Sequence, residues 1–192
     1  GTDPSGVRHF YGARQDGSDV NARILDPDGR GTFRWLLAES IDTNGNRIAY
    51  QYSGDGSDSP QRYVSSIEYG ALEKPAPLGH QMIAFDWGPR PDPIVDYRST
   101  FRLQTNLRLQ NVRTWSSGVL AARYHLEYTE RNSSSLLHRV TRFGSDDQSS
   151  LPPAEFDYTA STFKSDTRLV QVSTLNAVAP PHLLPQGVAD PT

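Results

Sequence analysis

The segment 42–46, with the sequence DTNGN, carries acidic and amide side chains at alternate positions, and such oxygen ligands suit Ca²⁺. An EF-hand loop requires glycine at its sixth position and glutamate at its twelfth. Counted from Asp42, the sixth residue is Arg47 and the twelfth is Ser53, while Gly45 is the fourth. We therefore interpret the segment as a turn, with a calcium site as the alternative.

The residue types that most often bind metals or act as nucleophiles follow no recognisable motif. The chain has no cysteine, which excludes disulfides, zinc thiolates and thiol catalysis. It has neither a GxSxG motif nor a glycine-rich phosphate loop. We expect no enzymatic activity, no cofactor and no metal. No histidine has the spacing of a ligand pair, and we interpret each as a strand or surface residue: His9, His80, His125, His138 and His182.

Glu39 is the one carboxylate that stands among the apolar residues of an expected strand. A buried carboxyl group often has a raised pKa and can act as an acid. A hydrolase would need a second carboxylate within about 5–10 Å, and the sequence places none there. We favour a structural role, in which Glu39 accepts a hydrogen bond from Tyr50 or from a neighbouring strand.

Two further sets of residues could recognise a ligand. Trp35, Trp87 and Trp115 could form a platform for sugar rings, although aromatic side chains on strands more often belong to a core. The loop GPRPDP, with Arg90 and Asp92, could be a recognition loop. Such a loop is more often a rigid turn with a surface ion pair, which is the interpretation we favour.

Apart from His182, these residues lie on or between short segments whose apolar side chains alternate with the period of a β-strand. Clusters rich in Gly, Pro, Asp and Ser separate the segments, as in an antiparallel meander of short strands and hairpins. We find no amphipathic helix, although residues 21–25 could form one helical turn. The fold class is predicted as all-β, with strands over 7–12, 31–41, 47–53, 62–70, 81–87, 100–115, 119–128, 136–143 and 154–158.

The strongest hairpin signal is Asn44-Gly45, because a type I′ turn needs positive φ at both central residues. We expect a second turn at residues 116–118, before the cleanly alternating strand 119–128. The register around Asn44-Gly45 predicts these cross-strand pairs: Thr43 with Asn46, Asp42 with Arg47, Ile41 with Ile48, Glu39 with Tyr50 and Leu37 with Tyr52. One face should then collect Phe33, Trp35, Leu37, Ile41, Ile48, Tyr50 and Tyr52, with an Asp42–Arg47 ion pair on the other.

The whole-chain properties are those of a β-rich module. The chain has 192 residues and a net charge of −3. It therefore lacks the net positive charge that would indicate binding to nucleic acid or to an anionic membrane. No apolar run approaches the roughly 20 residues that span a bilayer, and the first residues lack a signal-peptide pattern. We expect a β-meander module over residues 1–160 and an irregular linker over 161–192 toward a further domain, so that this chain is a piece of a longer protein.

Several short motifs occur in the order of a known family. The order resembles the middle region of the SpvB/TcB-type B component of insecticidal toxin complexes, which is related to Rhs and YD-repeat proteins. The resemblance covers most of residues 7–158, and its most specific part is D-x-NGN-x-I-x-Y-x-Y. The motifs are YG at 11–12, WLL-x-E-x-x-D-x-NGN-x-I-x-Y-x-Y at 35–52, I-x-YG at 67–70, R-x-D at 90–92, Y-x-L-x-Y at 124–128 and LPP-x-x-F-x-Y at 151–158.

The resemblance implies a structural role in a secreted or cell-surface-associated bacterial protein. In such complexes the B and C components form a hollow shell of wound β-strands around a toxic effector. A β-propeller of the B component docks the shell on a channel-forming A component. This region would be part of the shell or of its junction with the propeller. Its implied partners are the C-type shell subunit, the A-type channel subunit and the enclosed effector, without direct membrane insertion.

No catalytic residue of the family can be carried over, so the candidate site is the structural hairpin: Trp35, Glu39, Asp42, Asn44, Gly45, Asn46, Tyr50 and Tyr52. The main alternative is a secreted carbohydrate-binding β-module. That alternative predicts a concave aromatic surface with exposed tryptophan, whereas the shell interpretation predicts that Trp35 is buried in the sheet.

Overall fold

The structure, a computed structural model, describes residues 1–70, 79–131 and 133–159. The chain divides into two units, and the first, Gly1–Asp157, contains every strand of the described residues. The second, Tyr158–Thr192, lies outside the described residues except for its first two, and so does the predicted linker. All regular structure in the described residues is β and the strand pairs are antiparallel, which confirms the predicted fold class.

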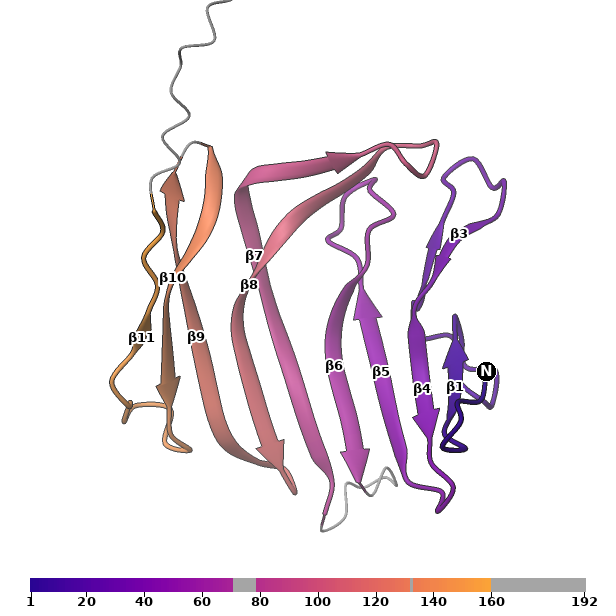
Figure 1. Cartoon of the computed structure of the whole chain (residues 1–192), viewed down its shortest axis with the longest axis horizontal. Coiled ribbons are helices and arrows are strands. Elements are labelled where there is room, and N and C mark those ends of the chain that lie inside the picture. The colour runs from indigo at the N-terminus through magenta and orange to yellow at the C-terminus, as the bar shows by residue number, and fades with distance from the viewer. Residues whose placement is uncertain (71–78, 132, 160–192) are drawn as a thin grey trace, which may run out of the picture. The chain divides into compact units, whose positions relative to one another are not determined.

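Nine strands form one sheet that follows the chain order except that β1 pairs directly with β4 (Figure 1). Its order is β1-β4-β5-β6-β7-β8-β9-β10-β11, and β2 and β3 form a separate two-stranded sheet. Neighbours in sequence are neighbours in space, as expected for a meander. The strands are β1 Arg8–Tyr11, β2 Arg23–Leu25, β3 Thr32–Trp35, β4 Leu37–Ile41, β5 Arg47–Ser53, β6 Tyr63–Gly70, β7 Gln81–Asp96, β8 Leu103–Ser116, β9 Val119–Arg131, β10 Ser134–Phe143 and β11 Ala154–Glu155.

The strand predicted over residues 31–41 is in fact two strands in different sheets. Between β3 and β4, the N–H of Leu36 donates to the carbonyl of Ala22 at 2.7 Å, and its carbonyl accepts from Gly12 at 2.9 Å. The two backbone groups of Leu36 therefore bond to two different segments, and the strand changes partners there. The helical turn suggested for residues 21–25 is wrong, since Arg23–Leu25 is a strand.

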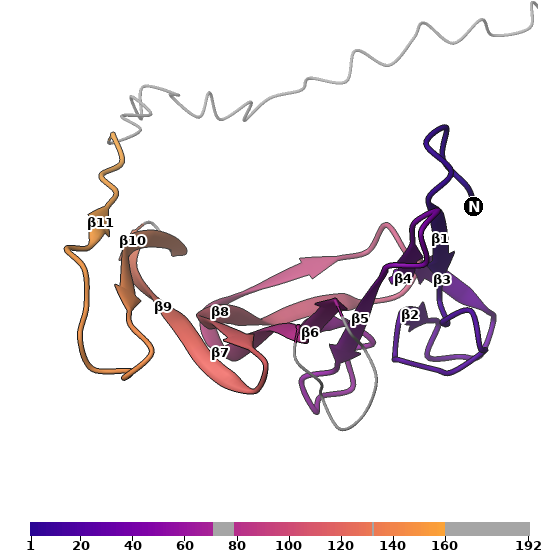
Figure 2. The same cartoon turned by 90° about the horizontal axis from the view of Figure 1, so that it is seen from below.

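β7 is longer than predicted because the GPRPDP segment continues this strand to Asp96 instead of ending it, while β8 begins at Leu103, later than predicted. The register with β8 breaks between Pro89 and Ile94. Proline has no N–H to donate to a ladder, and three prolines alternate through this segment. Beyond the break, the β7–β8 ribbon turns aside and crosses the ends of β6 and β5 toward β3 (Figures 1 and 2).

The register predicted for the β4–β5 hairpin is wrong by one residue. The observed pairs are Glu39 with Ala49, Ser40 with Ile48 and Ile41 with Arg47. The turn closes from Asp42 to Asn46, whose backbone groups bond at 3.0 Å, and Gly45 has φ of 85° while Asn44 has no positive φ. This is a three-residue loop with a glycine in the left-handed region, not a type I′ turn.

The type I′ geometry occurs instead in the β8–β9 hairpin. Ser116 pairs with Val119, and the two residues between them, Ser117 and Gly118, have φ of 49° and 83°. Positive φ at both central residues is what a two-residue hairpin turn requires. The turn expected at residues 116–118 is therefore present, in the conformation predicted for the other hairpin.

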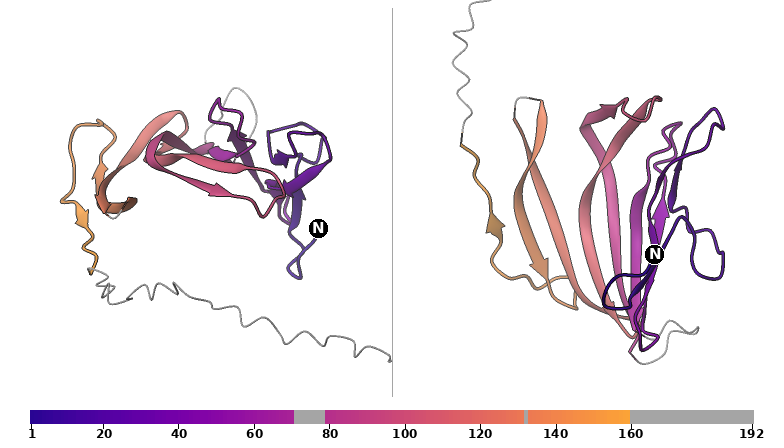
Figure 3. Two further views of the ribbon diagram at one scale, coloured as in Figure 1. Left: turned by 90° about the horizontal axis from the view of Figure 1, so that it is seen from above. Right: turned by 45° about the vertical axis from the view of Figure 1, so that its right-hand side comes forward.

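The fully buried core is small and lies beside β4. Val20, Ala22 and Ala38 form its cluster, with Leu36 and Tyr52 packed against it. The N–H of Tyr52 donates to the carbonyl of Val20 at 3.1 Å, which fixes the segment before β2 against β5. The remaining strands twist and diverge from one another (Figure 3), as sheets of L-residues do.

Candidate assembly surface

Glu39 is a buried structural carboxylate. Its side chain is 2% exposed and lies 2.6 Å from the guanidinium of Arg47, which is 42% exposed. Its other oxygen accepts the backbone N–H of Gln15 at 3.0 Å. Of the two donors expected for Glu39, Tyr50 is wrong, because the shifted register places it on the opposite face. The neighbouring strand β5 supplies Arg47 instead. Glu39 thus joins β4, β5 and the segment that follows β1.

Asp42 caps the loop of the β4–β5 hairpin. One carboxylate oxygen accepts the N–H groups of Asn44 and Asn46, both at 2.8 Å, and the other accepts the Asn46 side-chain amide at 2.7 Å. These donors, the Asn46 side chain foremost, hold the pKa of Asp42 below its usual value. The predicted Asp42–Arg47 ion pair is wrong, since Arg47 pairs with Glu39.

Tyr52 and Trp35, which also belong to the candidate site, differ in their exposure to solvent. The Tyr52 hydroxyl donates to the carbonyl of Leu37 at 2.9 Å, and burial raises the pKa of Tyr52. Trp35 is 57% exposed, so the expectation that it is buried is wrong for the described residues. It lies over Gly12, where a Cβ atom would come within 2.6 Å of its Cδ1 atom. The indole is therefore seated on backbone with its outer side open.

Asp3, His9 and Ser40 form an arrangement that the sequence did not reveal. His9 Nδ1 lies 3.0 Å from Ser40 Oγ, and His9 Nε2 lies 3.5 Å from an Asp3 carboxylate oxygen. A hydrolytic triad needs an accessible nucleophile beside a site for the substrate. Ser40 is 7% exposed, and it lines none of three grooves on the described part of the chain. The arrangement ties the N-terminal segment to β4.

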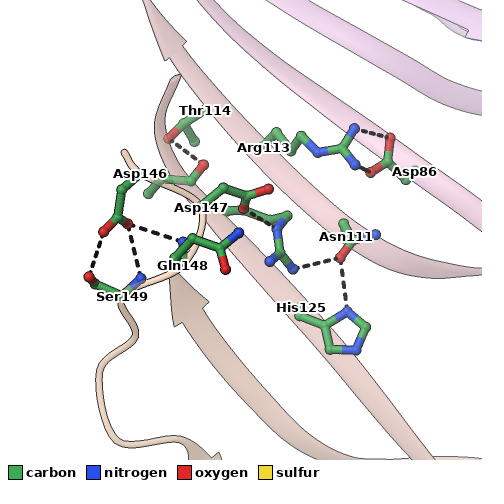
Figure 4. Close-up of polar contacts among 11 residues, drawn as sticks. Asp86, Asn111, Arg113, Thr114, His125, Asp146, Asp147, Gln148 and Ser149 are labelled. Atoms are coloured by element: carbon green, nitrogen blue, oxygen red, sulfur yellow. Dashed lines mark hydrogen bonds and ion pairs between the residues drawn. The ribbon is translucent and has the colours of Figure 1, made fainter. Parts of the chain in front are cut away.

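One face of the sheet is charged, and its charges are paired across strands (Figure 4). Asp86 on β7 pairs with Arg113 on β8 at 2.9 Å. Asn111 on β8 bonds His125 on β9 at 2.9 Å. Arg123 on β9 binds Asp147, which lies in the turn between β10 and β11, and its guanidinium covers the Phe143 ring at 4.0 Å. Within each pair the polar groups of the two side chains bond to each other, as is common on a sheet face in contact with water.

The opposite face of the same strands is apolar. Because side chains alternate along each strand and paired residues share a face, the register places many apolar side chains on one side of β5 to β10, including a group of nine. None of the nine is fully buried by the described residues. The nine are Ile48, Tyr50, Ile67, Ile83, Phe85, Val112, Tyr124, Leu126 and Val140. We call this set the apolar face.

Arg90 and Asp92 form an ion pair as predicted, but it lies within β7 and is largely buried, not on the surface of a turn. Arg90 donates two hydrogen bonds to Asp92, at 3.1 and 3.0 Å. Both side chains are largely buried, with 13% and 15% of their surface exposed. Asp92 also accepts the N–H of Ser135 at 2.7 Å and its hydroxyl at 2.6 Å. Arg90 and then Ser135 hold the pKa of Asp92 well below its usual range. The pair links β7 to β10, which are not neighbours in the sheet.

Two open grooves flank the displaced part of the β7–β8 ribbon. One, of about 450 Å³, is lined by Pro27, Ser57, Asp58, Ser59, Arg102, Gln104 and Asn106. The other, of about 550 Å³, is lined by Arg90, Asp92, Pro93, Ile94 and Ser133 to Ser135. The described residues contain no group of three or more metal-ligating side chains. His182 lies outside them.

These features define an all-β module whose apolar face is left partly exposed by the described residues. Residues 2–76 match the model of a family described as SpvB, Salmonella virulence plasmid 65kDa B protein. No curated protein matches the chain. Within the described residues, no helix has the length and apolar character needed to cross a membrane.

Solved structures share the fold of this module. The crystal structure of TcdB2-TccC3 matches with a TM-score of 0.66 and 24% identity, over 81% of this chain. The Photorhabdus luminescens Tc holotoxin pore matches with a TM-score of 0.68 and 23% identity, also over 81%. This chain spans only 10% of the length of each of those chains.

The N-terminal domain of effector protein SpvB from Salmonella typhimurium strain LT2 matches over 74% of this chain and 59% of its own, with a TM-score of 0.59 and 22% identity. The family model and these structures confirm the resemblance drawn from the sequence: the chain is similar to SpvB-type B components of toxin complexes.

Proposed function

We propose that this chain is a non-catalytic segment of a bacterial toxin-complex shell, which encloses a toxic effector and helps to deliver it. Its partners would be a C-type shell subunit, an A-type channel subunit and the effector, in a secreted or cell-surface-associated assembly. Rhs and YD-repeat proteins would be its wider relatives.

The observation that carries this proposal is the apolar face. Domains normally pack two layers of secondary structure around one core, and here the described residues leave the apolar side of a nine-stranded sheet partly exposed. A wall that encloses a polypeptide needs such a broad surface and no deep pocket. The shared fold with TcdB2-TccC3 supports the same role.

Protection of an enclosed polypeptide tests the proposal. The full-length protein that carries this chain would be co-expressed with a C-type subunit bearing a reporter peptide, and the rate of reporter cleavage by added protease would be measured. We expect slow cleavage with the wild-type protein and faster cleavage with Ile83→Glu, which puts a charge on the apolar face. Ala84→Glu, one residue along β7 and on the charged face, is the matched control. Rapid cleavage with the wild-type protein would refute encapsulation.

A second candidate, a carbohydrate-binding module, is favoured by the exposure of Trp35. An indole with one open side can stack on a sugar ring. Binding of the chain to a glycan array, and its loss in Trp35→Ala but not in Tyr97→Ala, would support this candidate. Tyr97 is a suitable control because it is 65% exposed at the tip of the β7–β8 ribbon. An array with no binding would reject it.

A further inference from the structure

We propose that residues 89–107, the displaced part of the β7–β8 ribbon, form a strap that opens as a unit at a lower free energy than the sheet. Asp92 is its latch, the residue whose hydrogen bonds hold the strap closed. We call these residues the strap. The inference stands apart from the proposed function and rests on how the strap is held.

The strap lacks the strand neighbours that stabilise the rest of its hairpin. β7 pairs with β6 only between Gln81 and Ala84, and β8 pairs with β9 only between Asn111 and Ser116. Among the described residues, the strap itself keeps only the ladder between its own two strands, from Pro89–Leu107 to Asp96–Leu103. A two-stranded ribbon is marginally stable in water. Other contacts must therefore hold the strap in place.

The first of these contacts is the latch at the corner. Asp92 accepts two hydrogen bonds from Ser135, at 2.7 and 2.6 Å, across 43 residues of sequence. Arg108 donates to the same Ser135 hydroxyl at 2.7 Å, and its guanidinium lies 4.7 Å from the centre of the Tyr128 ring. The corner is thus fixed to β9 and β10 by charged and polar groups that converge on one serine.

The other contacts hold the middle and the tip. The N–H and carbonyl of Gln104 both bond the Ser59 hydroxyl, at 3.0 and 2.8 Å. Asn106 bonds Asp55 and the Tyr63 hydroxyl, both at 2.8 Å. At the tip, the rings of Phe101 and Phe33 meet edge to face at 5.8 Å. The polar bonds can be replaced by water when the strap opens, so each contributes little net stability.

Both faces of the strap carry exposed apolar side chains. Ile94, Val95 and Tyr97 are 53%, 42% and 65% exposed, whereas Leu103 of the strap and Tyr63 beneath it are 7% and 4% exposed. Segments with few buried apolar contacts and many exposed bonds open at lower free energy than the core. The strap is such a segment, hinged where the prolines interrupt the ladder. If the chain is a shell segment, a neighbouring subunit could displace the strap without unravelling the sheet.

Hydrogen–deuterium exchange followed by mass spectrometry tests this inference on the full chain. In the wild type, amides in 94–96 and 103–107 should exchange at least about tenfold faster than those in 81–86 and 109–116, with a weaker dependence on urea. Equal rates and equal urea dependence in both sets would overturn it, since the hairpin would then open as one unit.

Substitution of the latch gives the second readout. Asp92→Ala should speed exchange in the strap and in residues 134–136 and leave 81–86 unchanged. Asp86→Ala, which removes a carboxylate–arginine pair from the unbent half of the same strand, should not speed exchange in the strap. If Asp92→Ala fails to fold, Ser135→Ala provides the same comparison. A uniform acceleration throughout the sheet would show that Asp92 supports the whole fold and is no latch.

Discussion

The hairpins β4–β5 and β8–β9 have similar turn signals but turn in different ways. The first contains Asn44-Gly45 and forms a three-residue loop, while the second contains Ser117-Gly118 and forms a two-residue type I′ turn. The difference follows from what flanks each turn. Glu39 is buried beside the first, whereas Val119, next to the second, is 67% exposed.

A buried carboxylate explains the shift of register. In the predicted register Arg47 would face Asp42, on the other face from Glu39, which would then be buried without a cation. A shift of one residue moves Arg47 to the face of Glu39, and the two groups meet at 2.6 Å. An unpaired buried charge costs more than a less favoured turn, so the ion pair sets the register. The β8–β9 turn bears no such constraint and follows its local preference.

The largest expected effect tests the role of this ion pair. Glu39→Ala and Arg47→Ala should each lower the free energy of unfolding by about 2–4 kcal/mol, toward the lower end because Arg47 is 42% exposed. The double variant should cost less than the sum by at least about 1 kcal/mol, because each single variant leaves a charge unpaired. Urea denaturation followed by circular dichroism measures all three. Additive losses would show that the pair does not set the register.

A smaller effect is expected at the two turn glycines. Gly45→Val and Gly118→Val should each cost about 1–2 kcal/mol, because a β-branched residue tolerates positive φ poorly. A Cβ at either position meets nothing within 4 Å, so the cost comes from the backbone alone. Asparagine tolerates the left-handed region, and Gly45→Asn is the control that should cost less. A neutral Gly45→Val would reject the left-handed loop.

Acid should weaken the first hairpin and not the second. The pKa of Asp42 is lowered in the folded chain, so its contribution is present above the unfolded pKa of about 3.9 and is lost as the pH falls through the folded pKa. The stability difference between wild type and Asp42→Asn should therefore be constant above about pH 5 and shrink below about pH 4. Denaturation curves recorded above about pH 5 and below about pH 4 measure it. A difference independent of pH would show that Asp42 does not titrate with folding.

The smallest effect concerns calcium. Three donors of the hairpin loop already occupy the carboxylate of Asp42. Added CaCl₂ or EDTA should shift the melting temperature by less than about 1 °C, since a ligand stabilises only the state that binds it. A rise with calcium that Asp42→Asn abolishes would restore the metal interpretation of DTNGN.

The strands were the most predictable part of this fold. Alternation in the segment 47–53 gave the bounds of β5 as observed, and Gly/Pro clusters marked most of the other strands. The break at Leu36 was not predictable, because it depends on hydrogen bonds to Ala22 and Gly12. The link from Asp92 to Ser135 was missed for the same reason. The sequence does contain a signal for it, namely an aspartate between two prolines and a later serine-rich turn.

The sequence by itself determined the all-β class, the meander order and the absence of cysteine chemistry, because these depend on residue type and short-range periodicity. Tertiary structure alone decided the register of β4–β5, the exposure of Trp35 and the course of the strap. Each of these depends on contacts between residues far apart in the chain, where the cost of burying a charge or leaving a polar group unpaired outweighs local preference.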